Sequence, residues 1–122
     1  MELVKLEDYN HIYAVDTFAK EYKGLFGKSK KDYTSYKQIL ETNLRILDRV
    51  DLQQALTYLQ FEKLENEELY SIRHVSKSNP RVIFASVLEG HVILLVAFKE
   101  KRESDYQNAL RKAKDRMKEL EE

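Results

Sequence analysis

Three apolar runs decide the fold: LYSIRHVS (residues 69–76), RVIFASVL (residues 81–88) and HVILLVAF (residues 91–98). Each run is rich in the β-branched and aromatic residues that favour strands. Glu89 and Gly90 stand between the second and third runs, and a two-residue turn that contains Gly is typical of a β-hairpin. The sequence therefore predicts a three-stranded antiparallel meander, the sheet core, over about residues 69–99.

Two helices are predicted ahead of this sheet, as a helical hairpin over about residues 16–51. Asp16 or Thr17 is a suitable cap for the first helix. Its apolar face consists of Phe18, Ala19, Tyr22, Leu25 and Phe26. Asp32 is a suitable cap for the second helix, after the loop GKSKKD. The apolar face of this longer helix, at the 3–4 spacing of an amphipathic helix, consists of Tyr36, Ile39, Leu40, Leu44, Leu47 and Val50.

The remaining segments complete an α+β domain that spans residues 1–122. Residues 12–18 (IYAVDTF) predict an edge or outer strand, and residues 2–6 predict a short strand or an ordered tail. Residues 52–68 are expected to hold a helical turn and then an extended approach to the sheet. The S-x-x-Q pattern from Ser104 to Gln107 predicts a capping box for a final helix over about residues 105–121. Its apolar stripe consists of Tyr106, Ala109, Leu110, Ala113, Met117 and Leu120.

Composition narrows the possible functions. No run approaches the roughly 18 apolar residues of a membrane span, and the N-terminus lacks the apolar segment of a secretory signal. A cytoplasmic protein is therefore expected. The absence of Cys excludes disulfides and thiolate metal sites. The chain is neutral overall, but residues 69–118 carry 11 Lys and Arg against 5 Asp and Glu. This asymmetry indicates a surface for a polyanion, although lysines that are simply solvent-exposed would produce the same pattern.

The candidate chemistry lies in cations around the sheet. Arg73 and Arg81 lie within or at the start of predicted strands, and Lys99, Lys101 and Arg102 follow the third strand. The ends of neighbouring strands meet in a meander, so these cations are expected to gather. Arg presents a fork that suits phosphate, and Lys adds a point charge that can also shuttle a proton.

For Tyr106 and the histidines, the sequence gives weaker evidence of a functional role. Tyr106 can stack on a base, or transfer a proton if nearby cations lower its pKa, but it also lies on a helix stripe that predicts core packing. His74 neighbours Arg73, and a structural or exposed role is the simpler interpretation for it. The three histidines have no metal-binding spacing, so no metal and no other cofactor are expected.

In the order of these motifs, the chain resembles the RelE/ParE superfamily of bacterial toxins. It is most similar to the HigB-type and phage-derived branch of that superfamily. The matching elements are the LYSIR strand (residues 69–73), the RVIF strand (residues 81–84), Leu94 to Phe98, the basic cluster from Lys99 to Arg102, and the final helix. The resemblance covers about residues 69–118 well and the N-terminal hairpin in outline. It implies a RelE-like fold with a small antiparallel sheet, an N-terminal helical hairpin and a C-terminal helix.

The resemblance also implies a function and a site. RelE-like toxins of type II toxin–antitoxin systems are metal-independent endoribonucleases that cleave mRNA in the ribosomal A site and inhibit translation, with the 2′-hydroxyl as the attacking group. The implied partners are a cognate antitoxin, the ribosome and mRNA, with no membrane and no small-molecule cofactor. The implied catalytic residues are Arg73, Arg81, Lys99, Lys101 and Tyr106. The implied RNA-binding residues are Arg102, Lys77 and His74.

Two alternatives stay open at this point. A ParE-like toxin would keep the fold and inhibit gyrase, although such members usually lose the catalytic cations. A catalytically inactive binding protein is the other alternative, because the chain departs from the family pattern. Ser71 stands where a basic residue is expected, and Val96-Ala97 precede Phe98 where the HigB branch usually has His-Gly. The zero net charge is also unlike these strongly basic toxins.

Overall fold

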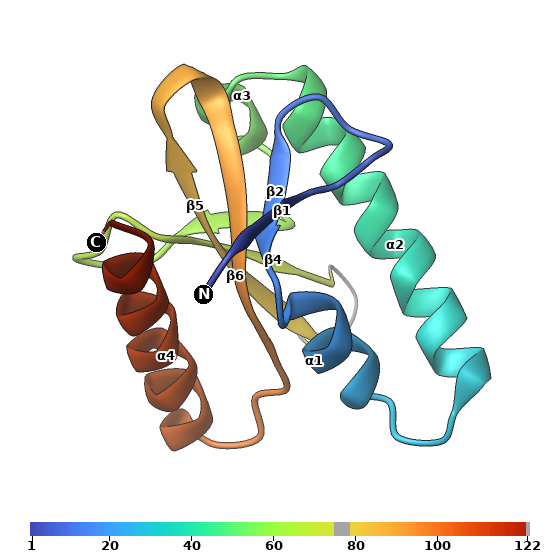
Figure 1. The fold of residues 1–122 in the computed structure, drawn as a ribbon. Helices are drawn as coiled ribbons and strands as arrows, with labels where there is room; N and C mark the ends of the chain where they lie inside the picture. The colour runs from blue at the N-terminus through green and yellow to red at the C-terminus, as the bar shows by residue number, and fades with distance from the viewer. Residues whose placement is uncertain (75–78, 122) are drawn as a thin grey trace.

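The apolar runs form strands of a six-stranded sheet with helices around it (Figure 1). The computed structural model describes residues 1–74 and 79–121. Its strands are β1 (Leu3–Lys5), β2 (Ile12–Val15), β3 (Phe61–Lys63), β4 (Tyr70–Arg73), β5 (Arg81–Val87) and β6 (His91–Phe98). Its helices are α1 (Phe18–Gly24), α2 (Lys30–Arg49), α3 (Leu52–Ala55) and α4 (Glu103–Glu121). The α+β prediction is confirmed, with N-terminal helices, a mostly antiparallel sheet and a C-terminal helix packed on it.

The strand order is β1-β2-β6-β5-β4-β3. Strands β3 to β6 are consecutive and antiparallel, which confirms the meander and adds β3 to it. Strand β2 runs parallel to β6, with Ile12 opposite Val92. The prediction that residues 12–18 form an edge or outer strand is only partly right, because β1 pairs antiparallel with β2 and takes the edge itself.

The turn between β5 and β6 has the positive φ that the sequence predicts at Gly90, but it is longer than predicted. Val87 pairs with His91, so the connection is Leu88–Gly90, one residue longer than expected. Glu89 has φ 66° and Gly90 has φ 74°, and positive φ at two successive residues is characteristic of tight hairpin turns.

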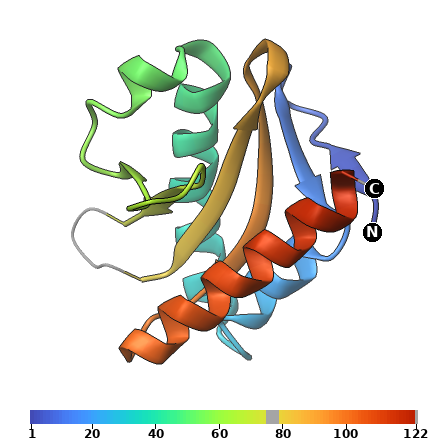
Figure 2. The same ribbon diagram turned by 90° about the vertical axis from the view of Figure 1, so that its left-hand side faces the viewer.

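Helices cover both faces of the central strands. Helix α4 crosses β5 and β6 on one side of the sheet, and α2 lies on the other side (Figures 1 and 2). The largest fully buried side chains come from β2, β5 and β6 and include Ile12, Ile83, Phe84, Leu94 and Leu95. Burial on both faces explains why these strands appear in the sequence as continuous apolar runs rather than as alternating patterns.

The helix boundaries correct two predicted caps. Helix α2 begins at Lys30, and the side chain of Ser29 caps it by accepting from the backbone N–H of Asp32 at 3.2 Å. Asp32 therefore lies within the first turn and is not the cap. Helix α4 begins at Glu103, ahead of the predicted capping box. Its first turn is held by Asp105, whose carboxylate accepts from the backbone N–H groups of Lys101 and Arg102 at 2.9 and 3.0 Å.

The predicted apolar faces are largely buried. In α1 and the turn after it, Phe18, Tyr22 and Phe26 are buried, whereas Ala19 is exposed. In α2, Leu40, Leu44 and Leu47 are buried, whereas Ile39 is 38% exposed. In α4, Ala109 and Ala113 are buried, and Tyr106, Leu110, Met117 and Leu120 are half-buried against the core. Among the described residues, no helix is long and apolar enough to cross a membrane.

One buried cation joins three elements. Arg116 of α4 is 9% exposed, and its Nη1 donates to the carbonyl oxygen of Leu95 in β6 at 2.6 Å. The same atom donates to Oε1 of Glu21 in α1 at 2.9 Å, and Nη2 donates to Oε2 of Glu21. Burial of Arg116 is tolerated because a carboxylate and a backbone carbonyl satisfy its donors.

Candidate functional site

The predicted cations lie where β4 ends, β5 begins and β6 ends. In the sheet register Arg73 is opposite Arg81, and Arg81 is opposite Phe98, the residue before Lys99. Residues directly opposite each other on neighbouring strands point to the same face. The two arginines are therefore adjacent and share a face of the sheet, next to the strand end that leads into the basic segment.

Arg81 is held by an acidic neighbour. Its Nη1 donates to Oε2 of Glu100 at 3.0 Å, and its side chain is only 16% exposed. Asn79 fixes the backbone of Glu100, accepting from its N–H at 2.7 Å and donating to its carbonyl oxygen at 2.8 Å. The Nε of Arg81 is buried and has no partner among the described residues. Arg81 is thus rigidly placed, with part of its charge neutralised.

Arg73 is more available than Arg81. Its Nε donates to the carbonyl oxygen of Leu59 at 3.2 Å, and its backbone N–H donates to Gln60 at 2.9 Å. No carboxylate pairs with Arg73 in the part of the chain that the structure describes. A guanidinium with one nitrogen held by a carbonyl keeps its terminal N–H groups for a bidentate contact, which is the geometry that phosphate favours.

The cationic side chains of the segment after β6 do not all lie in the same place. The Nζ of Lys99 lies 5.3 Å from the centre of the Phe26 ring, so this side chain extends toward the end of α1. Lys101 and Arg102 are exposed, and their backbone N–H groups bind Asp105. These two hydrogen bonds lower the pKa of the Asp105 carboxyl below its ordinary value. The basic cluster is therefore not one compact patch.

Tyr106 lies close to Arg81 but is not activated by it. Burial raises the pKa of the Tyr106 hydroxyl, and Arg81 acts in the opposite direction without overcoming this effect. The expectation that neighbouring cations lower the pKa of Tyr106 is not met. At neutral pH the hydroxyl stays protonated, so it can donate a hydrogen bond but cannot serve as a base.

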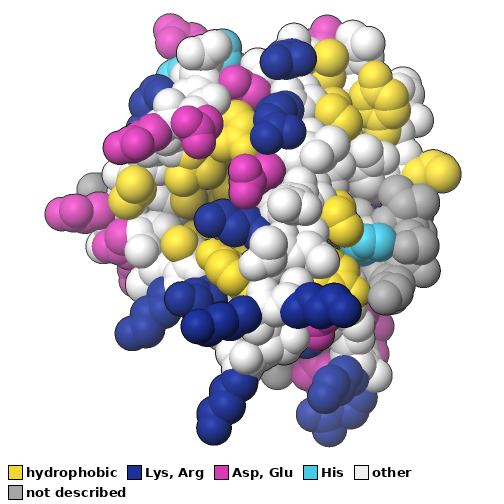
Figure 3. All heavy atoms as spheres, turned by 90° about the vertical axis from the view of Figure 1, so that its right-hand side faces the viewer, with side chains coloured by type: hydrophobic (Ala, Val, Ile, Leu, Met, Phe, Trp, Pro, Cys, Tyr) yellow, Lys and Arg dark blue, Asp and Glu magenta, His cyan; other side chains and the backbone are white. Residues whose placement is uncertain are grey.

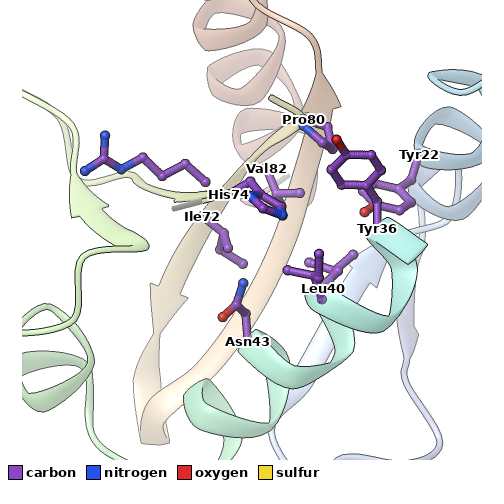
Figure 4. A pocket seen from close by; sticks show the side chains of 10 residues that line it. Tyr22, Tyr36, Leu40, Asn43, Ile72, His74, Pro80 and Val82 are labelled. Atoms are coloured by element: carbon purple, nitrogen blue, oxygen red, sulfur yellow. The ribbon is translucent and has the colours of Figure 1, made fainter. Parts of the chain in front are cut away.

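His74 lines a small hollow between the sheet and α2 (Figure 4). Its ring centre is 5.4 Å from that of Tyr36, and Asn43 and Val82 also line this hollow. A volume of about 20 Å³ has room for a water molecule but not for a base. Lys77, another predicted RNA-binding residue, lies outside the described residues.

No protein-family model matches this chain, and no curated protein matches it. Two arginines side by side can hold a phosphodiester and stabilise charge that develops on its oxygens. Among residues 1–74 and 79–121, no group of three or more His, Asp or Glu side chains is placed to bind a metal ion.

Reasoning from the sequence missed Asn79 and Glu100. The sequence does hold a sign that Glu100 pairs with a cation, because this acid interrupts the basic run from Lys99 to Arg102, two residues after Phe98. Only the register, which places Arg81 opposite Phe98, identifies Arg81 as the partner of this acid. The contribution of Asn79 carries no comparable signal, because its contact depends on how the chain enters β5.

Proposed function

We propose that this chain is a RelE-like toxin of a type II toxin–antitoxin system that cleaves mRNA on the ribosome without a metal ion. The observation that carries the proposal is the adjacent pair Arg73 and Arg81, in register on one face of the sheet. The two N-terminal helices, the antiparallel meander and the C-terminal helix support the finer assignment of a RelE-like fold. Such a toxin acts in the cytoplasm and has a cognate antitoxin as its partner.

The proposed reaction is an attack of a ribose 2′-hydroxyl on the adjacent phosphorus. Water takes the proton of the 2′-hydroxyl, the 2′-oxygen–phosphorus bond forms and the phosphorus–5′-oxygen bond breaks. The leaving 5′-oxygen takes a proton from water, which gives a cyclic phosphate and a free 5′-hydroxyl. Negative charge builds on the non-bridging oxygens, where Arg73 and the remaining donors of Arg81 would stabilise it. Tyr106, protonated at neutral pH, would donate a hydrogen bond or stack on a base. Lys99, Lys101 and Arg102 would add positive charge along the RNA path.

The test is inducible expression in a bacterial host, with mapping of new RNA 5′ ends. The wild type should arrest growth and produce cuts within translated frames. Arg73→Ala should lower cleavage on the order of 10²–10³-fold, because a charge-stabilising donor is lost. Arg111→Ala removes an exposed arginine from α4 and serves as the matched control, with cleavage unchanged. Equal cleavage by the wild type and Arg73→Ala would refute the assigned role of Arg73.

Arg81 needs a separate comparison, because its contact with Glu100 also stabilises the fold. Arg81→Gln and Glu100→Gln each break the same ion pair while keeping a polar side chain of similar length. If Arg81 acts on the phosphate, only Arg81→Gln should abolish cleavage, and Glu100→Gln should preserve or increase it. Equal losses in both variants would assign Arg81 a purely structural role.

A catalytically inactive RNA-binding protein is the second candidate. The Arg81–Glu100 ion pair favours it, because a paired guanidinium stabilises a transition state less well than an unpaired one. Absence of growth arrest and of new 5′ ends would select this candidate. Growth arrest with DNA damage and without new RNA cuts would instead select a ParE-like gyrase inhibitor.

A further inference from the structure

Aromatic rings and lysines gather at the corner where α1 leads into α2. The ring centres of Phe26 and Tyr36 are 5.4 Å apart, and those of Phe26 and Tyr33 are 6.0 Å apart. We define the aromatic–lysine surface by six residues: Lys23, Phe26, Tyr33, Tyr36, Lys37 and Lys99. The sequence analysis assigned none of these residues to RNA binding, and it assigned only Lys99 to catalysis.

The lysines lie directly over the rings. The Nζ atoms of Lys23 and Lys37 are 5.7 and 5.6 Å from the centre of the Tyr33 ring, and Lys99 lies over Phe26. All three lysines are exposed, and Tyr33 is half-buried. The Tyr33 ring and the exposed lysines are therefore presented together, whereas the Phe26 ring is buried below Lys99. Exposed cations beside an aromatic ring are the combination that proteins use to bind single-stranded nucleic acid.

The surrounding charge is strongly positive. Residues 20–37 contain six lysines and only two acids, Glu21 and Asp32. Glu21 is already paired with Arg116, which leaves its charge largely neutralised. Figure 3 shows Lys and Arg side chains gathered at the lower part of the face that carries α2, the end at which α1 and α2 are joined.

Part of the aromatic–lysine surface lines a groove. A hollow of about 490 Å³ opens between α1, α2 and the segment after β1, and Tyr33 and Lys37 line it together with Tyr22. This volume is much larger than the hollow beside His74 and can admit a nucleobase. Glu7, Asp8 and Glu41 also line the groove, so a phosphate backbone would be repelled from that part and held on the lysine side.

We propose that the aromatic–lysine surface binds single-stranded RNA, with a base on Tyr33 and the flanking phosphates on Lys23, Lys37 and Lys99. In the bound state the base takes one face of the Tyr33 ring, and the ammonium group over that face moves to a phosphate. The choice of RNA as the nucleic acid rests on the proposed function. Lys99 lies next to Phe98, the register partner of Arg81, so this surface begins at the same end of the sheet as the two arginines.

The test measures binding separately from cleavage. Fluorescence anisotropy with a 5′-labelled 12-nucleotide single-stranded RNA is recorded in the Arg73→Ala background, without ribosomes, over a range of salt concentrations. The starting protein should bind with a dissociation constant on the order of 1–100 μM at low salt. Tyr33→Leu should weaken binding by about 5- to 100-fold, because one stacked base is lost. Lys37→Gln should lower the slope of log affinity against log salt by about 0.7, the value for one phosphate contact on a single strand.

Two matched variants serve as controls. Tyr13→Leu removes a half-buried ring from β2, and Lys118→Gln removes an exposed lysine from α4. Both should leave the affinity unchanged, and thermal unfolding checks that every variant is folded. The proposal is overturned if the Arg73→Ala protein does not bind the single-stranded RNA, or if adding Tyr33→Leu leaves its affinity unchanged. It is also overturned if an RNA duplex binds more tightly than the single strand. RNA binding without growth arrest would refute the proposed nuclease function and support the RNA-binding surface. RNA cuts without binding would support the nuclease function and refute the RNA-binding surface.

Discussion

At the scale of single residues, the structure shows which polar side chains of the strands are buried and which are exposed. Ser71 is 2% exposed, faces the same side of the sheet as Ile83, its register partner, and its hydroxyl has no partner among the described residues. In the RelE-like toxins that the sequence resembles, a basic residue is expected at this position. A Lys or Arg here would have to bury its charge within the sheet, which the burial of this position disfavours.

The first stability prediction concerns this hydroxyl. Ser71→Ala should raise the free energy of unfolding by about 1 kcal/mol, because a buried group without a hydrogen bond is removed at almost constant volume. Urea unfolding monitored by circular dichroism measures the change. Ser86→Ala, at a half-buried position in β5, should have little effect. A loss of stability in Ser71→Ala would mean that the hydroxyl is hydrogen-bonded in solution.

At the scale of elements, the N-terminus of α4 links the basic segment to the sheet. The Asp105 carboxylate binds the backbone N–H groups of Lys101 and Arg102, and this contact orients the chain between β6 and α4. The side chains of both cations remain exposed. A local capping contact therefore positions two of the residues that we assign to the RNA path.

The element-scale prediction is a pH dependence. Hydrogen bonds to the backbone lower the pKa of Asp105 in the folded state, so its contribution to stability is complete above its unfolded pKa and is lost as pH falls through the lower folded value. Asp105→Ala should lower the melting temperature at pH 7, and the difference from the wild type should shrink below about pH 4. Asp115→Ala, on the exposed face of the same helix, is the control. A difference that does not change between pH 7 and pH 3 would contradict the capping role.

At the scale of the whole molecule, Arg116 holds the two helical layers to the sheet. It joins α4 to α1 through Glu21 and to β6 through the carbonyl oxygen of Leu95. The turn after α1 carries Phe26, over which Lys99 lies. The same ion pair that fixes the tertiary structure thus positions the corner that contains the aromatic–lysine surface.

The whole-molecule prediction follows from the loss of this ion pair. Arg116→Met should lower the free energy of unfolding by roughly 2–4 kcal/mol, because Glu21 and the Leu95 carbonyl lose their donor. The loss should be smaller than for a fully buried pair, since the Glu21 side chain is 25% exposed. Arg111→Met changes an exposed arginine of the same helix and should alter stability by less than about 0.5 kcal/mol. Equal effects of the two substitutions, measured by urea unfolding, would show that Arg116 does not join the layers.

The sequence by itself determined the elements whose signals are local. Continuous β-branched runs specify β5 and β6, the 3–4 spacing specifies α2 and α4, and Gly90 marks the hairpin between the central strands. The adjacency of Arg73 and Arg81 also followed from connectivity, because consecutive antiparallel strands bring their ends together. The caps at Asp32 and Ser104 were wrong because several residues near each helix start can accept a backbone N–H.

Only the tertiary structure decided which polar side chains are available. Glu100 neutralises Arg81 because the register places Arg81 opposite Phe98, and that register depends on strand packing rather than on any local pattern. Lys99 extends to Phe26, a residue 73 positions earlier in the chain. Periodicity reports which face of an element is buried, but it carries no information on which distant element covers that face. The partners of charged groups are set by that contact between elements, and so they emerge only when the chain is folded.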